Sequence, residues 1–470
     1  MTRAFPGTRL LLPLLVGAAT LAGREAWAPP VGGALYQDLG AGITTVVLSD
    51  PYPDGGRLLW ACGTNVVAKI DAAGFDVIAT LRHPGGESDD SGRRERVIAA
   101  IDAGPPGSAS DWAAASAAAP PDAPAPLLDA DNRLILSEER ALVAYGDAEP
   151  GARLSGIRVV QRFELAASIP GRFTGLAKTA DGHLIATTSA GFVVAVARGF
   201  ARLTTVRLPH APSGEVEDFV RGGPILDDRG GVYVATAHHL HRVAWDGANL
   251  STAPEAGAWS EKVSDGCAPG ASPVFPGGGS AGDRLVAVAT AGRRATVAAF
   301  WREEVPDPLP LKPGATALRS RLAAEEEIPF IRDRAPEAVR DAGKDGGDAA
   351  ATAARLFASP DGVLAYDGAS GGLAVLTWDP GRRLFVPRSS SDLRPGGGVV
   401  LSPDGRTAWF LVSEGNQTRL HGFDIAGAAP SRRVIGGARF FPRGATPILD
   451  PQGRLVSGCL FGVMRVKLEP

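Results

Sequence analysis

The feature that most constrains this chain is a short segment that recurs along its whole length. Residues 56–62 have a near twin in residues 453–459, and a second apolar run follows each within a few positions. Further copies begin at Asn132, Gly182, Gly231, Asp283, Gly362 and Gly405. Five of the seven intervals between the starting points run from 43 to 52 residues, and the other two span 76 and 79. Such a period predicts a repeat architecture, in which each unit buries its apolar face against its neighbours.

Each copy follows the same order of turn, strand, hairpin and second strand. The turn carries Asp and Gly, as at Asp361 and Gly362, because Asp bonds to its own backbone and Gly accepts a positive φ. The second strand often ends in Trp-Asp, as at Trp378 and Asp379. A short apolar segment before the turn predicts an additional, innermost strand. Three or four antiparallel strands per copy are typical of a propeller blade.

We therefore predict an all-β fold, a single closed β-propeller of eight blades, with seven blades as the alternative if one copy falls in an insertion. The last copy stops two strands in, after Val466. An N-terminal strand, at residues 34–37 or 43–48, is expected to complete that blade and close the ring. Closure matters because an open row of sheets would leave edge strands free to pair with other chains.

The two long intervals contain segments that depart from the repeat. Residues 82–126 are rich in Ala, Pro, Asp and Gly, and residues 305–355 are strongly charged around Glu325. We predict that both are insertions that leave the ring and are largely irregular. Short helices over residues 315–327 and 336–357 are a further expectation.

Residues 1–28 have the pattern of a secretory signal peptide. Arg3 and Arg9 precede an apolar run over residues 10–23, and Ala26 and Ala28 offer the small residues of a cleavage site. The run is short for a membrane span. We expect an exported protein, periplasmic or extracellular, whose propeller occupies residues 29–470. An uncleaved signal segment is the alternative, and it is the only contact with a membrane that we expect.

Charge and cysteine content narrow the range of partners. A net charge of −3, with 21% charged residues, provides no basic field for nucleic acid, so we expect no nucleic-acid partner. We also expect the protein to be a monomer. Three cysteines are too few for a disulfide framework. Cys62 and Cys459 occupy equivalent positions in copies that closure makes neighbours. Equivalent strands of adjacent blades lie too far apart for a disulfide, so we predict two buried thiols.

Two clusters are candidates for binding a ligand or a cation. His239 and His241 would share one face of a strand and could both reach a metal, although no further ligand at matching spacing is visible and a hairpin with polar exposed positions is the simpler explanation. Glu215, Glu217 and Asp218 lie in a loop that does not fit the repeat, and carboxylates at a channel mouth could bind calcium. We assign no metal and no cofactor, and calcium is the cation that the second cluster would favour.

Other conspicuous residues are better explained by the fold. Asp227 and Asp228 belong to the turn of their copy, and Trp301, at the end of a strand, is expected to pack between blades. The string Gly-x-Ser-x-Gly occurs around Ser280 and Ser370, but both serines sit in Gly-rich turns rather than between a strand and a helix. No zinc helix, phosphate loop or Cys-x-x-Cys pair is present in the sequence, which assigns no reaction.

Over residues 222–247 and 297–302, the sequence resembles exported bacterial propellers of the quinoprotein-like and of the strictosidine-synthase and lactonase-like superfamilies. This resemblance rests on the pattern of the blades and implies the fold, but no catalytic residue. The chain lacks the repeated tryptophan-docking motif and the vicinal cysteine pair of quinoprotein dehydrogenases, which speaks against a bound quinone. No Asn and Asp set of the calcium-dependent lactonases can be matched to it.

The sequence thus predicts an exported propeller that binds a small molecule or another protein at one face of its ring. One alternative is a calcium-dependent hydrolase of the lactonase or arylesterase kind. Another is a periplasmic structural or assembly scaffold, for which we expect a plugged channel and a large apolar patch.

Overall fold

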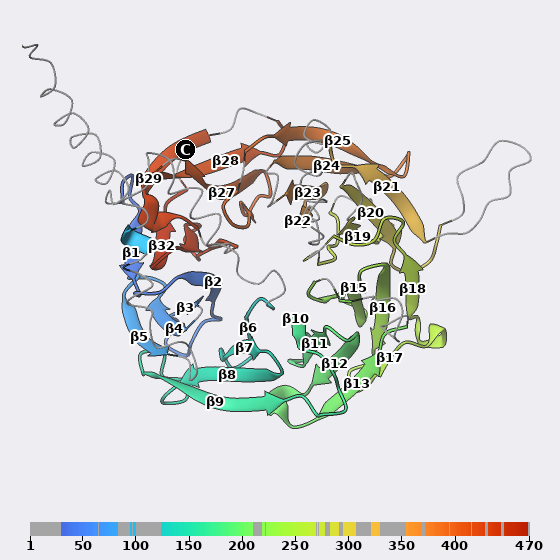
Figure 1. Cartoon of the computed structure of the whole chain (residues 1–470), viewed down its shortest axis with the longest axis horizontal. Helices are drawn as coiled ribbons and strands as arrows, with labels where there is room; N and C mark the ends of the chain where they lie inside the picture. Colours follow the sequence, from blue (N-terminus) through green and yellow to red (C-terminus); the bar gives the residue numbers. More distant parts are fainter. Residues whose placement is uncertain are drawn as a thin grey trace, which may run out of the picture.

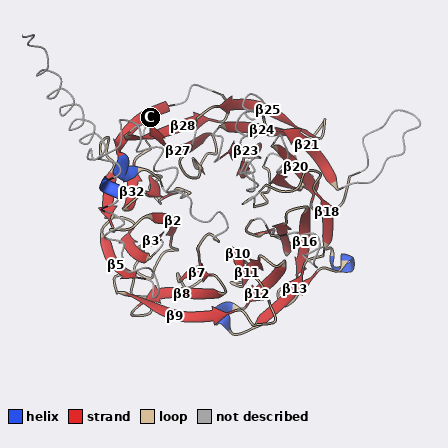
Figure 2. Cartoon of the chain, in the orientation of Figure 1, coloured by secondary structure: helices blue, strands red, loops and turns tan. Residues whose placement is uncertain are grey.

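The computed structural model arranges eight small antiparallel sheets around a central axis (Figure 1). It describes residues 30–63, 65–82, 95, 97–99, 124–209, 219–220, 222–268, 270, 272–277, 283–290, 295–306, 321–329, 354–367, 372–393, 395–414, 416–427, 431–442 and 446–468. Strands dominate these residues, and the helical pieces are short (Figure 2). The fold is an eight-bladed β-propeller, as the eight copies in the sequence predict.

The first four blades follow the chain, each with its first strand innermost. Blade 1 contains β2 (Ile43–Leu48), β3 (Leu58–Gly63), β4 (Val66–Asp71) and β5 (Val77–Arg82). Blade 2 contains β6 (Leu127–Leu128), β7 (Leu134–Glu138), β8 (Ala141–Asp147) and β9 (Ile157–Glu164). Blade 3 contains β10 (Phe173–Lys178), β11 (Leu184–Thr188), β12 (Phe192–Val196) and β13 (Leu203–Arg207). Blade 4 contains β14 (Ile225–Leu226), β15 (Gly231–Ala235) and β16 (His239–Trp245), with β17 (Leu250–Ser251) and β18 (Trp259–Lys262) both paired to β16.

The remaining four blades complete the circle. Blade 5 contains β19 (Leu285–Ala289), β20 (Thr296–Trp301) and β21 (Leu322–Glu327), and Val274 bridges to Ala287 at the innermost position. Blade 6 contains β22 (Ala354–Ser359), β23 (Gly362–Asp367), β24 (Leu373–Asp379) and β25 (Leu384–Ser391). Blade 7 contains β26 (Val400–Leu401), β27 (Thr407–Glu414), β28 (Gln417–Asp424) and β29 (Ser431–Gly437). Blade 8 contains β30 (Ile448–Leu449), β31 (Leu455–Gly458), β32 (Gly462–Val466) and β1 (Leu35–Asp38). Single 3₁₀ turns lie between strands at η1 (Arg198–Phe200), η2 (Pro254–Ala256) and η4 (Ala438–Phe440).

Blade 8 joins the two ends of the ring. Strand β1 pairs antiparallel with β32, with Leu35 opposite Arg465 and Asp38 opposite Gly462. The predicted N-terminal closure is therefore confirmed. Of the two segments proposed for it, residues 34–37 provide the closing strand, whereas residues 43–48 form the innermost strand of blade 1.

The turns between first and second strands are built as the repeat predicts. The Asp450 side chain accepts the backbone N–H groups of Gln452 and Arg454, each at 2.9 Å, and Gly453 adopts a φ of 71°. Asp227 does the same for the N–H groups of Arg229 and Gly231. Asp227 is thus a turn residue, and each such turn fixes its strand pair locally.

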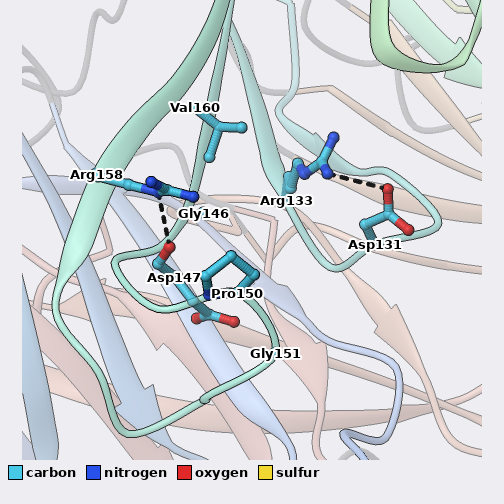
Figure 3. Close-up of a pocket in the computed structure, with 8 residues that line it drawn as sticks. All are labelled: Asp131, Arg133, Gly146, Asp147, Pro150, Gly151, Arg158 and Val160. Carbon is cyan, nitrogen blue, oxygen red and sulfur yellow. Dashed lines mark hydrogen bonds and ion pairs between the residues drawn. The ribbon is translucent and has the colours of Figure 1, made fainter.

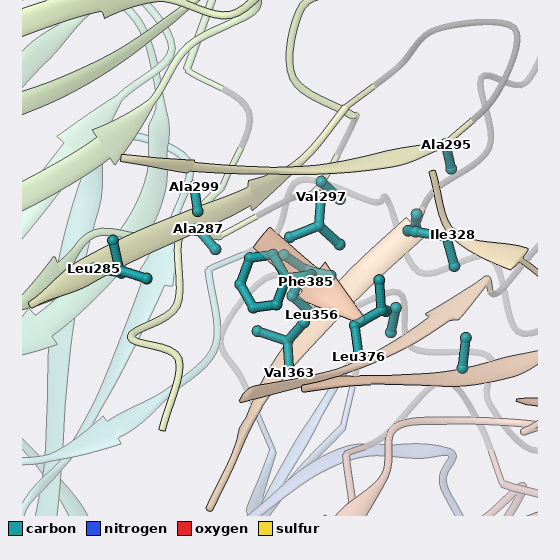
Figure 4. Close-up of a cluster of buried hydrophobic side chains, with 14 of the residues drawn as sticks. Leu285, Ala287, Ala295, Val297, Ala299, Ile328, Leu356, Val363, Leu376 and Phe385 are labelled. Atoms are coloured by element: carbon teal, nitrogen blue, oxygen red, sulfur yellow. The ribbon is translucent and has the colours of Figure 1, made fainter. Parts of the chain in front are cut away.

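Neighbouring blades pack face to face through apolar side chains. Between blades 5 and 6, Val297 and Ala299 face Leu356, Leu376 and Phe385 (Figure 4). The middle strands are accordingly buried on both faces, as the uninterrupted burial of β11 and β19 shows. The outermost strands alternate between exposed and part-buried positions.

Trp301 has the packing role that we expected. Its side chain is 4% exposed and meets Trp378 of the next blade edge-on, with 6.1 Å between ring centroids. The indole N–H of Trp378 donates to Asp283 at 2.8 Å, so the polar atom of the aromatic pair has a partner.

All three cysteines are free and buried. Cys62 ends the second strand of blade 1, and Cys459 follows the second strand of blade 8. The prediction of two buried thiols at these positions is confirmed. Burial raises the pKa of both thiols well above its usual value, which keeps them in the neutral form.

The expected helix over residues 315–327 is wrong for the part that the structure describes. Leu322–Glu327 form β21, the outermost strand of blade 5, and pair with β20. Their Ala- and Glu-rich composition favours a helix, but the open edge of β20 supplies backbone partners for a strand. Residues 354–357, at the end of the second expected helix, belong to β22. Residues 322–327 and 354–355 therefore belong to the ring and not to an irregular insertion.

The segment expected to leave the ring after β5 also returns to it. Residues 97–99 are helical, and Val97 is only 6% exposed. It packs against residues that follow β29 and β31, in blades 7 and 8 (Ala438, Phe441, Leu460 and Phe461). This part of the connection covers the ring instead of projecting from it.

The connections between strands lie on two faces of the ring. Because the strands of a blade alternate in direction, the first and third connections within a blade share one face, which we call the turn face. The hairpins between second and third strands, and the connections between blades, share the opposite face, which we call the hairpin face.

A buried ion pair joins blades 1 and 2 near the turn face. Lys69 of β4 has no exposed side-chain surface, and its Nζ lies 2.5 Å from Oδ1 of Asp147, at the end of β8. The same ammonium donates to the carbonyl of Ser155 at 2.9 Å, and Tyr52 approaches Asp147 at 3.4 Å. Burial lowers the pKa of Lys69, and the hydrogen bond that Lys69 donates to Asp147 opposes that shift.

We predict that the Lys69–Asp147 pair adds little net stability, and that each charge is needed mainly because the other one is buried. Lys69→Met should lower the free energy of unfolding by about 3–5 kcal/mol, because it leaves the Asp147 carboxylate buried and unpaired. The double variant Lys69→Met/Asp147→Leu should recover most of that loss. Denaturant unfolding measures both, with Arg162→Gln, which breaks an exposed ion pair of β9, as a nearly neutral control. A double variant as unstable as the two single variants combined would contradict the prediction.

Candidate functional site

The three acidic residues that the sequence singled out lie outside the described residues. Glu215, Glu217 and Asp218 belong to residues 210–218, between β13 and β14. The structure does define where this segment starts and ends. Leu208 and Val220 both pack with Val234 between blades 3 and 4, and Val220 bridges to Thr236 on the hairpin face.

The histidine pair lies beside the same point. His239 and His241 project from one side of β16, as predicted, with 5.7 Å between ring centroids. His241 is 1% exposed, and its Nε2 lies 3.3 Å from the hydroxyl of Thr236, which also accepts the backbone N–H of His239 at 3.1 Å. Thr236 thus links His241 to Val220, which follows the acidic segment in the sequence.

The described residues do not gather a set of ligands around these histidines. Among them, no three His, Cys, Asp or Glu side chains lie close enough together to hold a metal ion. The metal hypothesis for His239 and His241 therefore gains no third ligand from the described part of the chain. Ser280 and Ser370, of the two Gly-x-Ser-x-Gly strings, also lie outside the described residues.

A pocket on the hairpin face of blades 2 and 3 lies next to the start of the acidic segment. It has a volume of about 400 Å³, within the usual range for a ligand site. Three connections and the ends of two strands form it, with lining residues Ser168, Pro170, Ser189, Ala190, Phe192, Arg207 and Phe219. Its walls are largely apolar, with the guanidinium of Arg207 as the charged group. Phe219 is 37% exposed, so an aromatic ring is presented to solvent at this pocket.

Arg140 organises one wall of the pocket. Its guanidinium donates to the carbonyls of Gly171, Ile169 and Ala166 at 2.8, 3.0 and 3.1 Å, with a longer bond to Leu165. These carbonyls belong to the connection from β9 to β10, which carries Ser168 and Pro170. The planar guanidinium fork thus holds a loop that has no regular secondary structure of its own.

The sequence did not point to this pocket. Its residues come from three separate connections, and no motif or spacing links Pro170, Ala190 and Phe219. The one available signal was the departure of residues 208–223 from the repeat, which drew attention to the acids rather than to Phe219.

Comparison with known proteins agrees with the fold and assigns no family. No family model matches the chain. An uncharacterized protein of Archaeoglobus fulgidus is 25% identical over 298 residues, which cover 61% of this chain and 49% of that protein. The chain therefore spans about half the length of this curated relative.

Two solved structures illustrate the structural likeness. BamB from Moraxella catarrhalis is 12% identical, with a TM-score of 0.50 over 93% of this chain and 98% of that chain. Streptogramin B lyase is 10% identical, with a TM-score of 0.41 over 75% of this chain and 95% of that chain. At these identities the likeness concerns the fold alone, and the match with BamB agrees with a β-propeller.

We predict that Arg140 holds the pocket wall in place. Arg140→Ala should lower the free energy of unfolding by about 1–2 kcal/mol, because several carbonyls lose a charged donor. It should also speed amide hydrogen exchange within residues 165–171. Arg140→Lys should not restore either property, since one ammonium cannot span the same carbonyls. Exchange mass spectrometry measures the effect, and unchanged exchange of this loop in Arg140→Ala would contradict it.

Proposed function

We propose that this protein is an exported binding propeller that captures a ligand in the pocket on the hairpin face of blades 2 and 3. The observation that carries this proposal is that the partly exposed Phe219 and the charged Arg207 line one largely apolar cavity. An apolar cavity with one charged group favours a ligand that joins an apolar group to a carboxylate or another anion. A small organic acid and an acidic segment of another protein both have that chemistry.

The hairpin face is suited to this role because its connections differ from blade to blade. On blades 7 and 8, the same face is covered by Val97 and Ile98, which pack on Phe441 and Phe461. On blades 2 and 3, the pocket presents Phe219 to solvent. Binding residues commonly lie on such variable loops held by a rigid scaffold.

Export is supported by the sequence of residues 1–28. Within the described ranges, the structure contains no helix long and apolar enough to cross a membrane. We propose that the signal segment is removed and that the propeller acts as a monomer in the periplasm or outside the cell. N-terminal sequencing of the protein recovered from the native host tests this directly.

We predict that 8-anilinonaphthalene-1-sulfonate, which joins aromatic rings to one negative charge, binds this pocket. Phe219→Ser should weaken binding about 5- to 30-fold, as expected for the loss of an apolar contact worth about 1–2 kcal/mol. Arg207→Gln should weaken it and also reduce its dependence on salt, because the charged partner of the sulfonate is lost. Fluorescence titration measures both effects.

Two matched variants serve as controls for this titration. Arg202→Gln removes the same charge from the opposite end of the β13 region, on the turn face, and Leu322→Ser removes an exposed apolar side chain from β21. Neither should change the affinity. The pocket proposal is wrong if these controls weaken binding as much as Phe219→Ser does.

The calcium-dependent hydrolase remains the alternative function. It is favoured by one observation, that Val220, which follows the acidic segment, bridges to Thr236, whose hydroxyl lies 3.3 Å from Nε2 of His241. We predict no turnover of a panel of esters and lactones by the purified protein, as expected for a binding propeller. The alternative instead predicts one bound calcium per chain and turnover that disappears with a chelator. Replacing Glu215, Glu217 and Asp218 together with Ala should then remove both, and elemental analysis beside the activity panel measures them.

A further inference from the structure

A second cavity opens on the turn face of blade 2, on the opposite side of the ring from the proposed ligand pocket. Its volume is about 410 Å³, and its lining includes Arg133, Gly146, Pro150, Arg158 and Val160 (Figure 3). Arg133 follows the turn between β6 and β7, whereas Arg158 comes from the outermost strand β9. The two arginines flank the cavity from different strands.

Arg158 has unused hydrogen-bonding capacity. Its Nε donates to the backbone carbonyl of Asp147 at 3.2 Å (Figure 3). Within the part of the chain that the structure describes, its guanidinium forms no ion pair with a carboxylate. That single bond orients the guanidinium and leaves its terminal N–H groups for another acceptor.

Of the two carboxylates that line the cavity, that of Asp147 is already paired with a cation. Asp147 lines the cavity, but its Oδ1 bonds to the buried ammonium of Lys69 at 2.5 Å, and its side chain is only 6% exposed. The Lys69–Asp147 pair that joins blades 1 and 2 therefore keeps this acid from opposing an anion in the cavity.

The opposite wall carries paired charges as well. Arg133 pairs with Asp131 at 3.3 Å and lies 3.9 Å from Asp129, and Asp131 is shared with Arg198 of the next blade. Asp129 and Asp131 thus have Arg133 and Arg198 as ionic partners, so neither balances the positive charge of Arg158. The backbone bonds that Asp129 accepts fix the turn that carries Arg133.

The remaining walls are apolar and shaped by the backbone. A β-bulge at the pairing of Ala144 and Tyr145 leaves Val160 unpaired in β9, and its side chain lies close to Gly146, which pairs with Arg158. A Cβ at Gly146 would lie 2.7 Å from a methyl carbon of Val160, so glycine is needed for this close approach. With Pro150, Val160 gives the cavity an apolar side next to its charged groups.

We propose that this cavity is a binding site for a small organic anion. A carboxylate or phosphate group would lie between Arg158 and Arg133, where charge-assisted hydrogen bonds are available from two guanidinium groups. The apolar part of the ligand would pack on Val160 and Pro150. The site is separate from the proposed ligand pocket, and its occupation requires no residue of the hairpin face.

Calorimetric titration of the full chain with benzoate, phenyl phosphate, inorganic phosphate and benzyl alcohol tests this proposal. We expect benzoate or phenyl phosphate to bind, inorganic phosphate to bind more weakly, and neutral benzyl alcohol not to bind. Tighter binding of benzoate indicates a carboxylate ligand, and tighter binding of phenyl phosphate indicates a phosphate ligand. If neither aromatic anion binds, or if benzyl alcohol binds as tightly as they do, the proposal is overturned.

Variants then locate the site. Arg158→Gln and Arg133→Gln should each weaken binding at least about tenfold, whereas Arg162→Gln, which removes the same charge from the same strand, should not. Val160→Phe keeps every charge and fills the cavity, so it should abolish binding while the melting temperature stays close to that of the wild type. An equal effect of Arg162→Gln, or full binding by Val160→Phe, would refute the assignment.

Discussion

The pairing of β1 with β32 is the constraint on which the rest of the molecule depends. These strands are more than four hundred residues apart in the sequence, yet they lie side by side in blade 8. Their pairing fixes the last blade, so that β31 can pack against β2 and every blade has a neighbour on both sides. Contacts such as Trp301 with Trp378, or Lys69 with Asp147, can form only between blades held in register by a closed ring.

Those parts of the fold that local chemistry encodes were predictable from the sequence. The turns at Asp227 and Asp450 are built from residues adjacent in the chain, so their pattern is visible at every copy and gives the number of blades. Strand β21 was missed because its identity depends on a long-range partner, the open edge of β20, and not on its own Ala- and Glu-rich composition. The return of Val97 to blades 7 and 8 was missed for the same reason.

The candidate sites were harder to predict because closure of the ring, rather than the chain order, brings their residues together. Sequence reasoning found His239 and His241 since alternate positions of one strand share a face. It did not find Phe219 with Pro170, or Arg158 with Arg133, whose proximity depends on how separate connections and strands meet. The residues that line each pocket do not follow a regular spacing in the sequence, so no sequence motif identifies them.

Both cavities nevertheless lie where a copy departs from the repeat. A turn whose backbone hydrogen bonds depend on Asp and Gly tolerates few substitutions. The residues at the repeated positions are therefore determined by folding. The connection of residues 148–156 is longer than the equivalent turn in blade 1, and it contributes Pro150 to the cavity beside Arg158. Residues 208–223 likewise exceed the usual connection between blades and contribute Phe219. In a repeat protein, additional residues at one copy are free of the constraints that ring closure imposes on all copies. Such residues can therefore vary in a way that suits ligand binding.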